Sequence, residues 1–222
     1  MSFGWLLGLS IASLIFFAAS FVFSCRNYKR RFKENYDVRN HFPYEFNFES
    51  SFSENILGNI TLIFSLTFAI GLFAVVPSYI RNNGMLLYVL ISGIIFSIVV
   101  GAAHFIPLKY LKTHLVFSVL LFAASFATPA SIALTALKEY QLHNEIGVLV
   151  FMIISFVIAG FAFLMIMNPK MSLNIKMNVA TDDHGNEIYL RPKYIVFAIS
   201  EWILIYSLLV SEILTVILVK LL

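Results

Sequence analysis

The sequence predicts an all-α integral membrane protein, a six-helix transmembrane bundle with a small cytoplasmic β-hairpin. Apolar residue types make up 60% of the 222 residues and charged types only 12%, whereas soluble domains have about 45–50% and about 25%. Six stretches are long and apolar enough to cross a bilayer, which takes about 20 residues per helix. Lys and Arg are concentrated in alternate connections between these stretches. We therefore treat residues 1–222 as a single polytopic membrane domain.

The six spans are uninterrupted apolar runs, and all but the last lack Asp, Glu, Lys and Arg. None shows the alternation of apolar and polar residues that a membrane β-barrel strand requires, so we expect helices. No basic residue precedes the first run, whereas Cys25 and then Arg26 directly follow it. This pattern favours a retained helix over a cleaved signal peptide. The predicted spans are Gly4–Ser24, Ile56–Ile80, Met85–Pro107, Leu115–Leu137, Gly147–Met167 and Ile195–Val219.

The basic residues predict the orientation of the bundle. Twelve of the fifteen Lys and Arg residues lie in the first, third and fifth connections, and the other side has only Arg81, Lys138 and Lys220. Because basic residues are retained on the cytoplasmic side, we expect both termini outside and the long connections 25–55 and 168–194 in the cytoplasm. The regular alternation also supports a count of six helices.

The connection 25–55 is basic at its start and aromatic further along. Basic residues beside a membrane helix attract anionic lipid by about 1 kcal/mol each. One interpretation is therefore a site for lipid headgroups, and the other is that the positive charges only set the topology. The aromatic and acidic residues from His41 to Glu49 suit the membrane interface. The candidate headgroup-binding residues are Arg26, Lys29, Arg30, Arg31 and Lys33.

The connection 168–194 has the pattern of a β-hairpin. Apolar and polar residues alternate over Leu173–Val179, residues Thr181–Asn186 favour a turn, and apolar positions resume at Ile188 and Leu190. A two-stranded hairpin is marginal in water, so its apolar face is expected to contact the bundle, lipid or a partner. Asp182, Asp183 and His184 are interpreted as turn residues, and no metal site is predicted.

No motif indicates catalysis. The sequence lacks zinc-protease, P-loop and serine-hydrolase motifs, and no two of its five histidines are three or four residues apart. The single cysteine excludes an intramolecular disulfide and a zinc site built from several thiolates. A net charge of +3 is too small to indicate a nucleic-acid partner. We expect no catalytic residues and no cofactor, and an enzyme assembled from separate helices ranks below the two function classes given below.

The last span carries the strongest functional signal. Its two acidic residues, Glu201 and Glu212, are eleven residues apart, which is about 16 Å along a helix. A charged group that faces lipid costs about 2.5–3.5 kcal/mol or more, so both carboxyl groups should face the bundle interior, a watery cavity or a partner. The alternative is a structural role in which each carboxyl group bonds a nearby hydroxyl. The same helical sector, about 140° wide, also contains Ser200, Ser207, Ser211 and Thr215.

Two polar residues of other spans are expected at the depth of Glu201. Asn59 and His104 each lie at the inner end of a predicted span. A histidine beside a carboxylate gains proton affinity and can respond to pH. Glu212 is expected nearer the outer surface. The candidate residues for binding an ion or small solute are Glu201, Glu212, His104, Asn59, Ser200, Ser207 and Ser211.

Two function classes follow from these residues. The first is a transport-related protein, a carrier or permease component that handles a small solute or ion at Glu201. The alternative is a non-catalytic membrane subunit or assembly protein, in which the polar face and the hairpin dock onto a partner subunit or a second copy of the chain. Membrane lipids are partners in either class. A Glu201→Gln variant that loses activity but still assembles would support transport, and loss of both would support the subunit.

Overall fold

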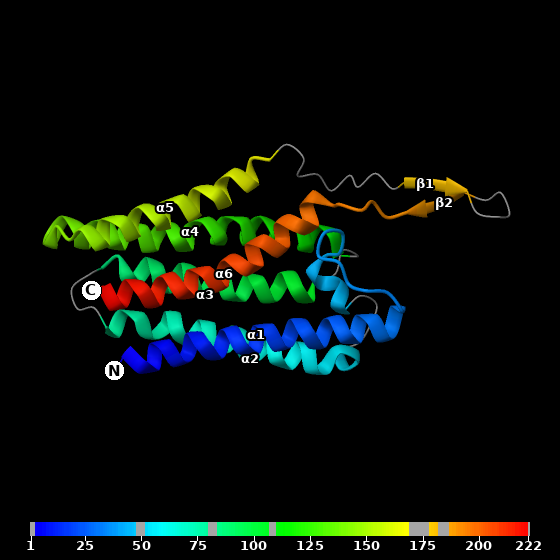
Figure 1. Ribbon diagram of the computed structural model, residues 1–222, viewed down its shortest axis with the longest axis horizontal. Helices are drawn as coiled ribbons and strands as arrows, with labels where there is room; N and C mark the ends of the chain where they lie inside the picture. Colours follow the sequence, from blue (N-terminus) through cyan, green and yellow to red (C-terminus); the bar gives the residue numbers. More distant parts are fainter. Residues whose placement is uncertain are drawn as a thin grey trace.

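The computed structural model describes residues 3–47, 52–79, 84–106, 110–168, 178–181 and 187–221. In these residues the chain forms six helices that are long and apolar enough to cross a membrane, as predicted, so the protein is a multi-pass membrane protein (Figure 1). The helices are α1 (Phe3–Phe32), α2 (Ile56–Val75), α3 (Leu86–Phe105), α4 (Leu111–His143), α5 (Ile146–Ile166) and α6 (Val196–Leu221). Three short 3-10 helices are η1 (Pro43–Asn47), η2 (Phe52–Asn55) and η3 (Val76–Ser78).

Two helices extend well beyond their predicted spans. α1 continues past Ser24 and ends with three basic residues in its last turn, where positive charge interacts favourably with the helix dipole. α4 begins at Leu111, so His114 lies in its first turns and not in a connection. At its other end Asn144 adopts a left-handed conformation with φ of 55°, which Asn tolerates better than most residues. This residue allows the short turn into α5.

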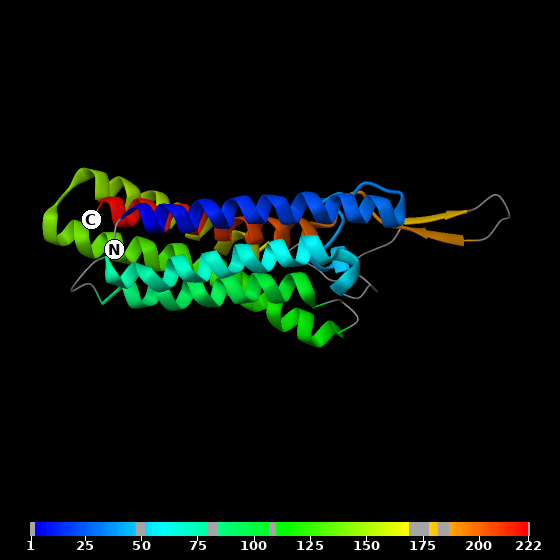
Figure 2. The same ribbon diagram turned by 90° about the horizontal axis from the view of Figure 1, so that it is seen from below.

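The helices pack in chain order from α1 to α5, and α6 returns to pack mainly against α4 and α1. Figures 1 and 2 show both termini at one end of the bundle, while residues 33–47 and the two strands lie at the opposite end. This arrangement is what an even number of spans requires. Figure 1 also shows that α6 runs obliquely across the bundle, and it is the most buried of the six spans.

Two short strands, β1 (Asn178–Thr181) and β2 (Glu187–Leu190), pair antiparallel with Asn178 opposite Leu190. They lie beyond the end of the helices in both views (Figures 1 and 2). The turn 182–186 and residues 169–177, which supply most of the expected alternating pattern, lie outside the described residues. The hairpin with one apolar face therefore stays a prediction, and the class shown by the structure is the helical membrane bundle.

The α2–α3 contact depends on a glycine. A side chain at Gly93 of α3 would overlap the ring of Phe73 in α2. Phe73 is fully buried, as are Leu72 and Phe96 beside it in the same apolar core. A small residue lets two helix backbones approach closely. Such packing drives helix association in a membrane, because the surrounding lipid is as apolar as the helices and the hydrophobic effect does not hold them together.

Candidate functional site

Both carboxyl groups of α6 are completely buried. Glu201 and Glu212 have 0% of their surface exposed, as expected from the cost of placing an acidic group in lipid. They lie on one face of α6 but contact different helices. The oblique path of α6 explains this difference, because it brings one face of the helix near α4 at one end and near α1 and α2 further along (Figure 1).

Glu201 contacts two polar side chains of α4. The Ser118 hydroxyl donates a hydrogen bond of 2.7 Å to Glu201 Oε1. The same oxygen lies 3.2 Å from His114 Nε2, and neither side chain has exposed surface. The second carboxyl oxygen, Oε2, is buried and has no hydrogen-bond partner among the described residues. The site therefore combines a fixed donor, a titratable ring and one uncommitted acceptor.

His114 Nε2 lies close to Glu201 Oε1 without forming a hydrogen bond among the described residues. His114 Nδ1 lies 2.8 Å from the carbonyl oxygen of Ile106, and since a carbonyl can only accept, Nδ1 carries a hydrogen and donates it. In a neutral histidine, Nε2 then carries no hydrogen. Its lone pair would face a carboxylate oxygen that also carries no hydrogen. The 3.2 Å contact is attractive only if a proton sits on Nε2 or on the carboxyl group. Either arrangement makes the pair neutral overall and gives it one exchangeable proton.

His114 was not among the candidates predicted from the sequence, because it falls just before the predicted span Leu115–Leu137. Its signal was a polar stripe on α4 that becomes visible once the helix is extended to Leu111. Residues three, four or seven positions apart share one helical face. The buried polar residues of this stripe are His114, Ser118, Ser125, Thr128, Ser131, Thr135 and Glu139.

Glu212 is held by the first two helices. The Ser13 hydroxyl donates to Glu212 Oε1 at 3.0 Å, and the Ser65 hydroxyl donates to the Ser13 carbonyl at 2.9 Å. Glu212 Oε2 is buried without a hydrogen-bond partner in the described part of the chain. Ser65 lies midway along α2, so Glu212 lies deeper in the bundle than the sequence suggested.

The serines of α6 have a different role from the carboxyl groups. Ser207 donates to the Leu204 carbonyl at 2.7 Å and Ser211 donates to the Ser207 carbonyl at 2.9 Å, both within the same helix. Ser200 is buried close to Glu201 in the chain. Hydroxyls that bond their own backbone satisfy themselves locally and do not join helices. On the polar face of α6, the described hydrogen bonds that reach other helices are therefore those of the two carboxyl groups.

His104 and Asn59 belong to a neighbouring cluster, and no contact joins either of them to Glu201 in the described residues. The His104 ring packs against Phe46, with ring centres 5.9 Å apart, and its Nε2 is buried without a described partner. Asn59 donates to Asn47 Oδ1 at 2.8 Å and to the Phe52 carbonyl at 3.2 Å. Asn59 therefore ties the connection after α1 to the start of α2.

The segment after α1 covers Glu201 and His114 at one end of the bundle. Tyr44 makes an edge contact with the His114 ring at 5.3 Å between centres, and Phe42 lies 5.9 Å from the ring of Phe197 in α6. We call residues 36–46 the cap. Its rings exclude water, which strengthens electrostatic interactions beneath them.

The cap is fastened to the start of α6 by polar contacts. Trp202 Nε1 donates to the His41 carbonyl at 3.0 Å, and the backbone N–H of Ile195 donates to the Arg39 carbonyl at 2.8 Å. Arg191, just before α6, forms hydrogen bonds of 2.7 and 3.0 Å with the Glu45 carboxylate. Burial lowers the pKa of Arg191, but these charge-assisted bonds outweigh it and raise the pKa above its usual value. The cap is thus locked in place by an ion pair at its edge.

Two tyrosines of the cap are shifted in the same direction. Burial and the nearby charge of Glu45 raise the pKa of Tyr36 well above its usual value, and the same two causes raise the pKa of Tyr44. Both phenols therefore remain neutral at pH values where exposed tyrosines ionise.

The described residues contain no group of three or more His, Cys, Asp or Glu that could hold a metal ion. Asp182, Asp183 and His184 lie outside them. Comparison with protein-family models, curated proteins and solved structures gave no match for the chain.

Proposed function

We propose that this membrane protein is transport-related and handles protons at the buried pair His114–Glu201, as a small carrier or permease component. The observation that carries the proposal is the 3.2 Å contact between two titratable side chains with no exposed surface. Ionisable groups inside a membrane are rare, and they mark ion pathways and proton relays. If the only role of this contact were to join α4 to α6, a hydrogen bond between two hydroxyl groups would be sufficient.

The proton balance of the pair supports a transport role. With one proton the pair is neutral, and removing that proton leaves a net negative charge in a buried site, which is costly without a replacement cation. Release of the proton is therefore coupled either to opening of the cap to water or to arrival of a cation at Glu201. The uncommitted Oε2 is the acceptor available to that cation.

Glu212 provides a second station further along the same helix. Eleven residues separate it from Glu201, about 16 Å at 1.5 Å per residue. Each carboxyl group is held by one serine hydroxyl and has one oxygen without a described partner. A proton or small cation that moves along α6 would meet two similar sites at different depths.

We also propose the orientation expected from the sequence. The end that holds the cap and the strands carries the connections with twelve of the fifteen basic residues, so it faces the cytoplasm. Both termini then lie outside. In this orientation the Glu201 site opens toward the cytoplasm when the cap moves.

Proton uptake by proteoliposomes tests the proposal. The purified full chain is reconstituted with a pH-sensitive dye inside, and a potential negative inside is imposed with potassium and valinomycin. We expect proton uptake by the native protein, reduced by about tenfold or more in Glu201→Gln and in His114→Gln, because each removes a group that holds the proton. No uptake by the native protein would contradict the proposal.

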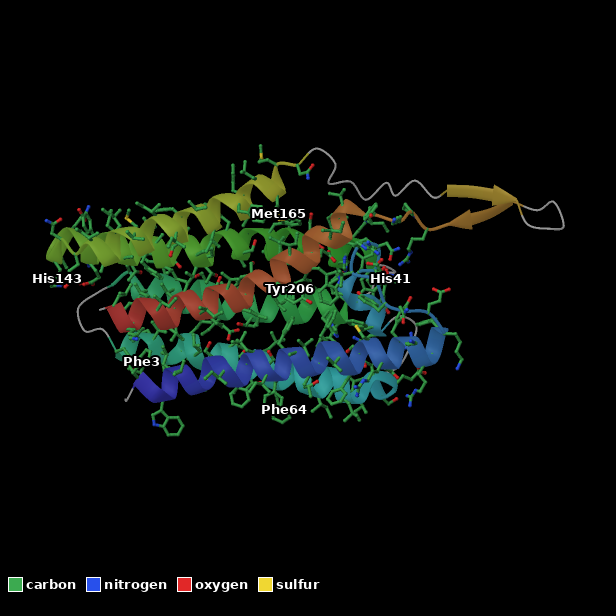
Figure 3. The ribbon with its side chains drawn as sticks, viewed as in Figure 1. Phe3, His41, Phe64, His143, Met165 and Tyr206 are labelled. Carbon is green, nitrogen blue, oxygen red and sulfur yellow. The ribbon has the colours of Figure 1, made fainter. Side chains whose placement is uncertain are left out.

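The matched control is His143→Gln. His143 lies 3.7 Å from Glu139, but its side chain is 64% exposed at the far end of α4 (Figure 3). It is the same residue type on the same helix, and its loss should leave uptake unchanged. If Glu201→Gln loses its fold along with its flux, the alternative of a non-catalytic membrane subunit is favoured.

A further inference from the structure

A hollow of about 390 Å³ lies where the end of α1 meets the start of α2. One wall carries Arg26, Asn27 and Arg30 of α1. The other wall carries the polar residues Ser53, Glu54 and Asn55 and, next to them, the apolar side chains of Ile56 and Leu57. Arg26 and Arg30 are four residues apart, so they lie on the same face of α1. The hollow therefore has a basic side and an apolar side.

Positive charge exceeds negative charge in this hollow, because Arg26 and Arg30 line it together with a single acidic residue, Glu54. Glu54 is paired with Arg31 at 3.4 Å, while Arg30 donates at 3.0 Å to the neutral side-chain oxygen of Asn27. Asn27 is itself held by a 2.7 Å hydrogen bond to the Glu54 carbonyl. Among the described residues no acidic side chain contacts Arg26 or Arg30. Within the described part of the chain, both guanidinium groups are therefore available to an anion.

The hollow continues into a membrane-facing apolar surface. Leu57 is 60% exposed, and Ile60 and Phe64 follow it on the same face of α2. Phe64 points outward from the bundle (Figure 3). An arginine pair at the end of a transmembrane helix, with exposed apolar side chains leading away from it, matches the two parts of a phospholipid.

We propose that this hollow binds an anionic phospholipid, with the phosphate between Arg26 and Arg30 and an acyl chain along Leu57, Ile60 and Phe64. Arginine suits this role because its planar group binds phosphate oxygens in pairs. The apolar continuation distinguishes a lipid from free phosphate, which has no use for it. The inference is independent of the proton site, since the hollow lies between α1 and α2 and involves neither His114 nor Glu201.

Native mass spectrometry of the full chain in mild detergent tests this inference. The protein is titrated with phosphatidylglycerol, with phosphatidylcholine of the same acyl chains, and with glycerol phosphate. We expect phosphatidylglycerol to bind with about tenfold or higher preference over phosphatidylcholine, and Arg26→Gln/Arg30→Gln to lose about tenfold in affinity for it. Glycerol phosphate should not displace the lipid at equal concentration.

The matched control is Lys29→Gln/Lys33→Gln. It removes the same amount of charge from exposed residues at the same end of α1 that do not line the hollow, and we expect a change below about twofold. Equal losses in the two double variants would overturn the site in favour of a diffuse basic surface. Equal binding of the two lipids would overturn it as well, and displacement by glycerol phosphate would assign the hollow to a soluble phosphate.

A second variant removes the cavity without touching the charges. Leu57→Trp places a larger ring over the hollow from an exposed position, where the substitution does not disturb the core. We expect it to weaken phosphatidylglycerol binding while both arginines remain. Unchanged binding in Leu57→Trp would show that the apolar wall has no part in the site and would overturn the proposal.

Discussion

His114 Nε2 lies 3.2 Å from Glu201 Oε1, and this contact links α4 to α6 in the buried part of the bundle. The two residues are 87 positions apart in the chain, by subtraction of their numbers. His114 is oriented by the Ile106 carbonyl on its other side. A histidine held in this way presents one fixed nitrogen to the carboxyl group.

The first prediction is that His114 and Glu201 are energetically coupled. Glu201→Gln, His114→Gln and the double variant form a cycle in which we expect a coupling free energy of about 1–3 kcal/mol, typical of contacting residues in one polar network. Unfolding of the purified protein in detergent measures it. The corresponding cycle at Glu139 and His143, whose histidine is largely exposed, should give less than about 0.5 kcal/mol. Equal coupling in the two cycles would argue against a special pair.

The second prediction concerns the support of Glu212. Ser13→Ala removes the hydroxyl that donates to Glu212 Oε1 and leaves a buried acceptor without its donor, which costs about 1–3 kcal/mol. Thermal unfolding in detergent should show the loss. Ser155→Ala is the control, because among the described residues the fully buried Ser155 hydroxyl donates only to the Phe151 carbonyl of its own helix. A cost in Ser155→Ala as large as that in Ser13→Ala would contradict the role of Ser13.

The third prediction is that the cap loosens at alkaline pH. Burial and Glu45 raise the pKa of Tyr36, so the neutral phenol is favoured in the folded cap. Its contribution to stability is complete below the unfolded pKa of about 10 and is lost as pH rises toward the folded pKa. Hydrogen exchange in residues 36–46, measured by mass spectrometry between pH 9 and 11 after correction for the intrinsic rate, should accelerate.

The control for the alkaline effect uses two tyrosines. Tyr36→Phe removes one of the two titrating phenols of the cap and with it the hydrogen bond of 2.8 Å to the Phe42 carbonyl. The cap should therefore exchange faster at every pH and show a smaller alkaline step, because Tyr44 still titrates. Tyr88→Phe changes an exposed tyrosine far from the cap, and hydrogen exchange in this variant should still accelerate at alkaline pH as in the native protein. An alkaline step of unchanged size in Tyr36→Phe would assign the step to another group.

The fourth prediction tests the close approach of α2 and α3. Gly93→Ala forces a methyl group against the buried Phe73 ring, and overpacking of this kind costs about 1–3 kcal/mol. Gly8→Ala places the same methyl group in open space and should stabilise α1 by up to about 1 kcal/mol through helix propensity. Thermal unfolding of both variants measures the contrast. Stabilisation by Gly93→Ala would show that the helices can separate at no cost.

The number of spans could be predicted from the sequence because lipid accepts few alternatives to a long apolar helix. The ends of the helices were predicted less accurately than their number, since a helix can continue through polar residues such as His114 beyond its apolar run. This error had a functional consequence, because it removed the partner of Glu201 from the candidate residues. His104 was favoured instead because it lies at a similar predicted depth, but depth alone does not say which side chains meet.

The sequence by itself determined that Glu201 and Glu212 turn away from lipid, because the cost of exposing an acid to hydrocarbon applies whatever the neighbouring helices are. Only the tertiary structure decided that Glu201 meets His114 and Ser118 while Glu212 meets Ser13. The reason is the oblique path of α6, which brings Glu201 to α4 and Glu212 to α1. Packing of this kind is set by many weak contacts between distant segments, and no local pattern encodes it.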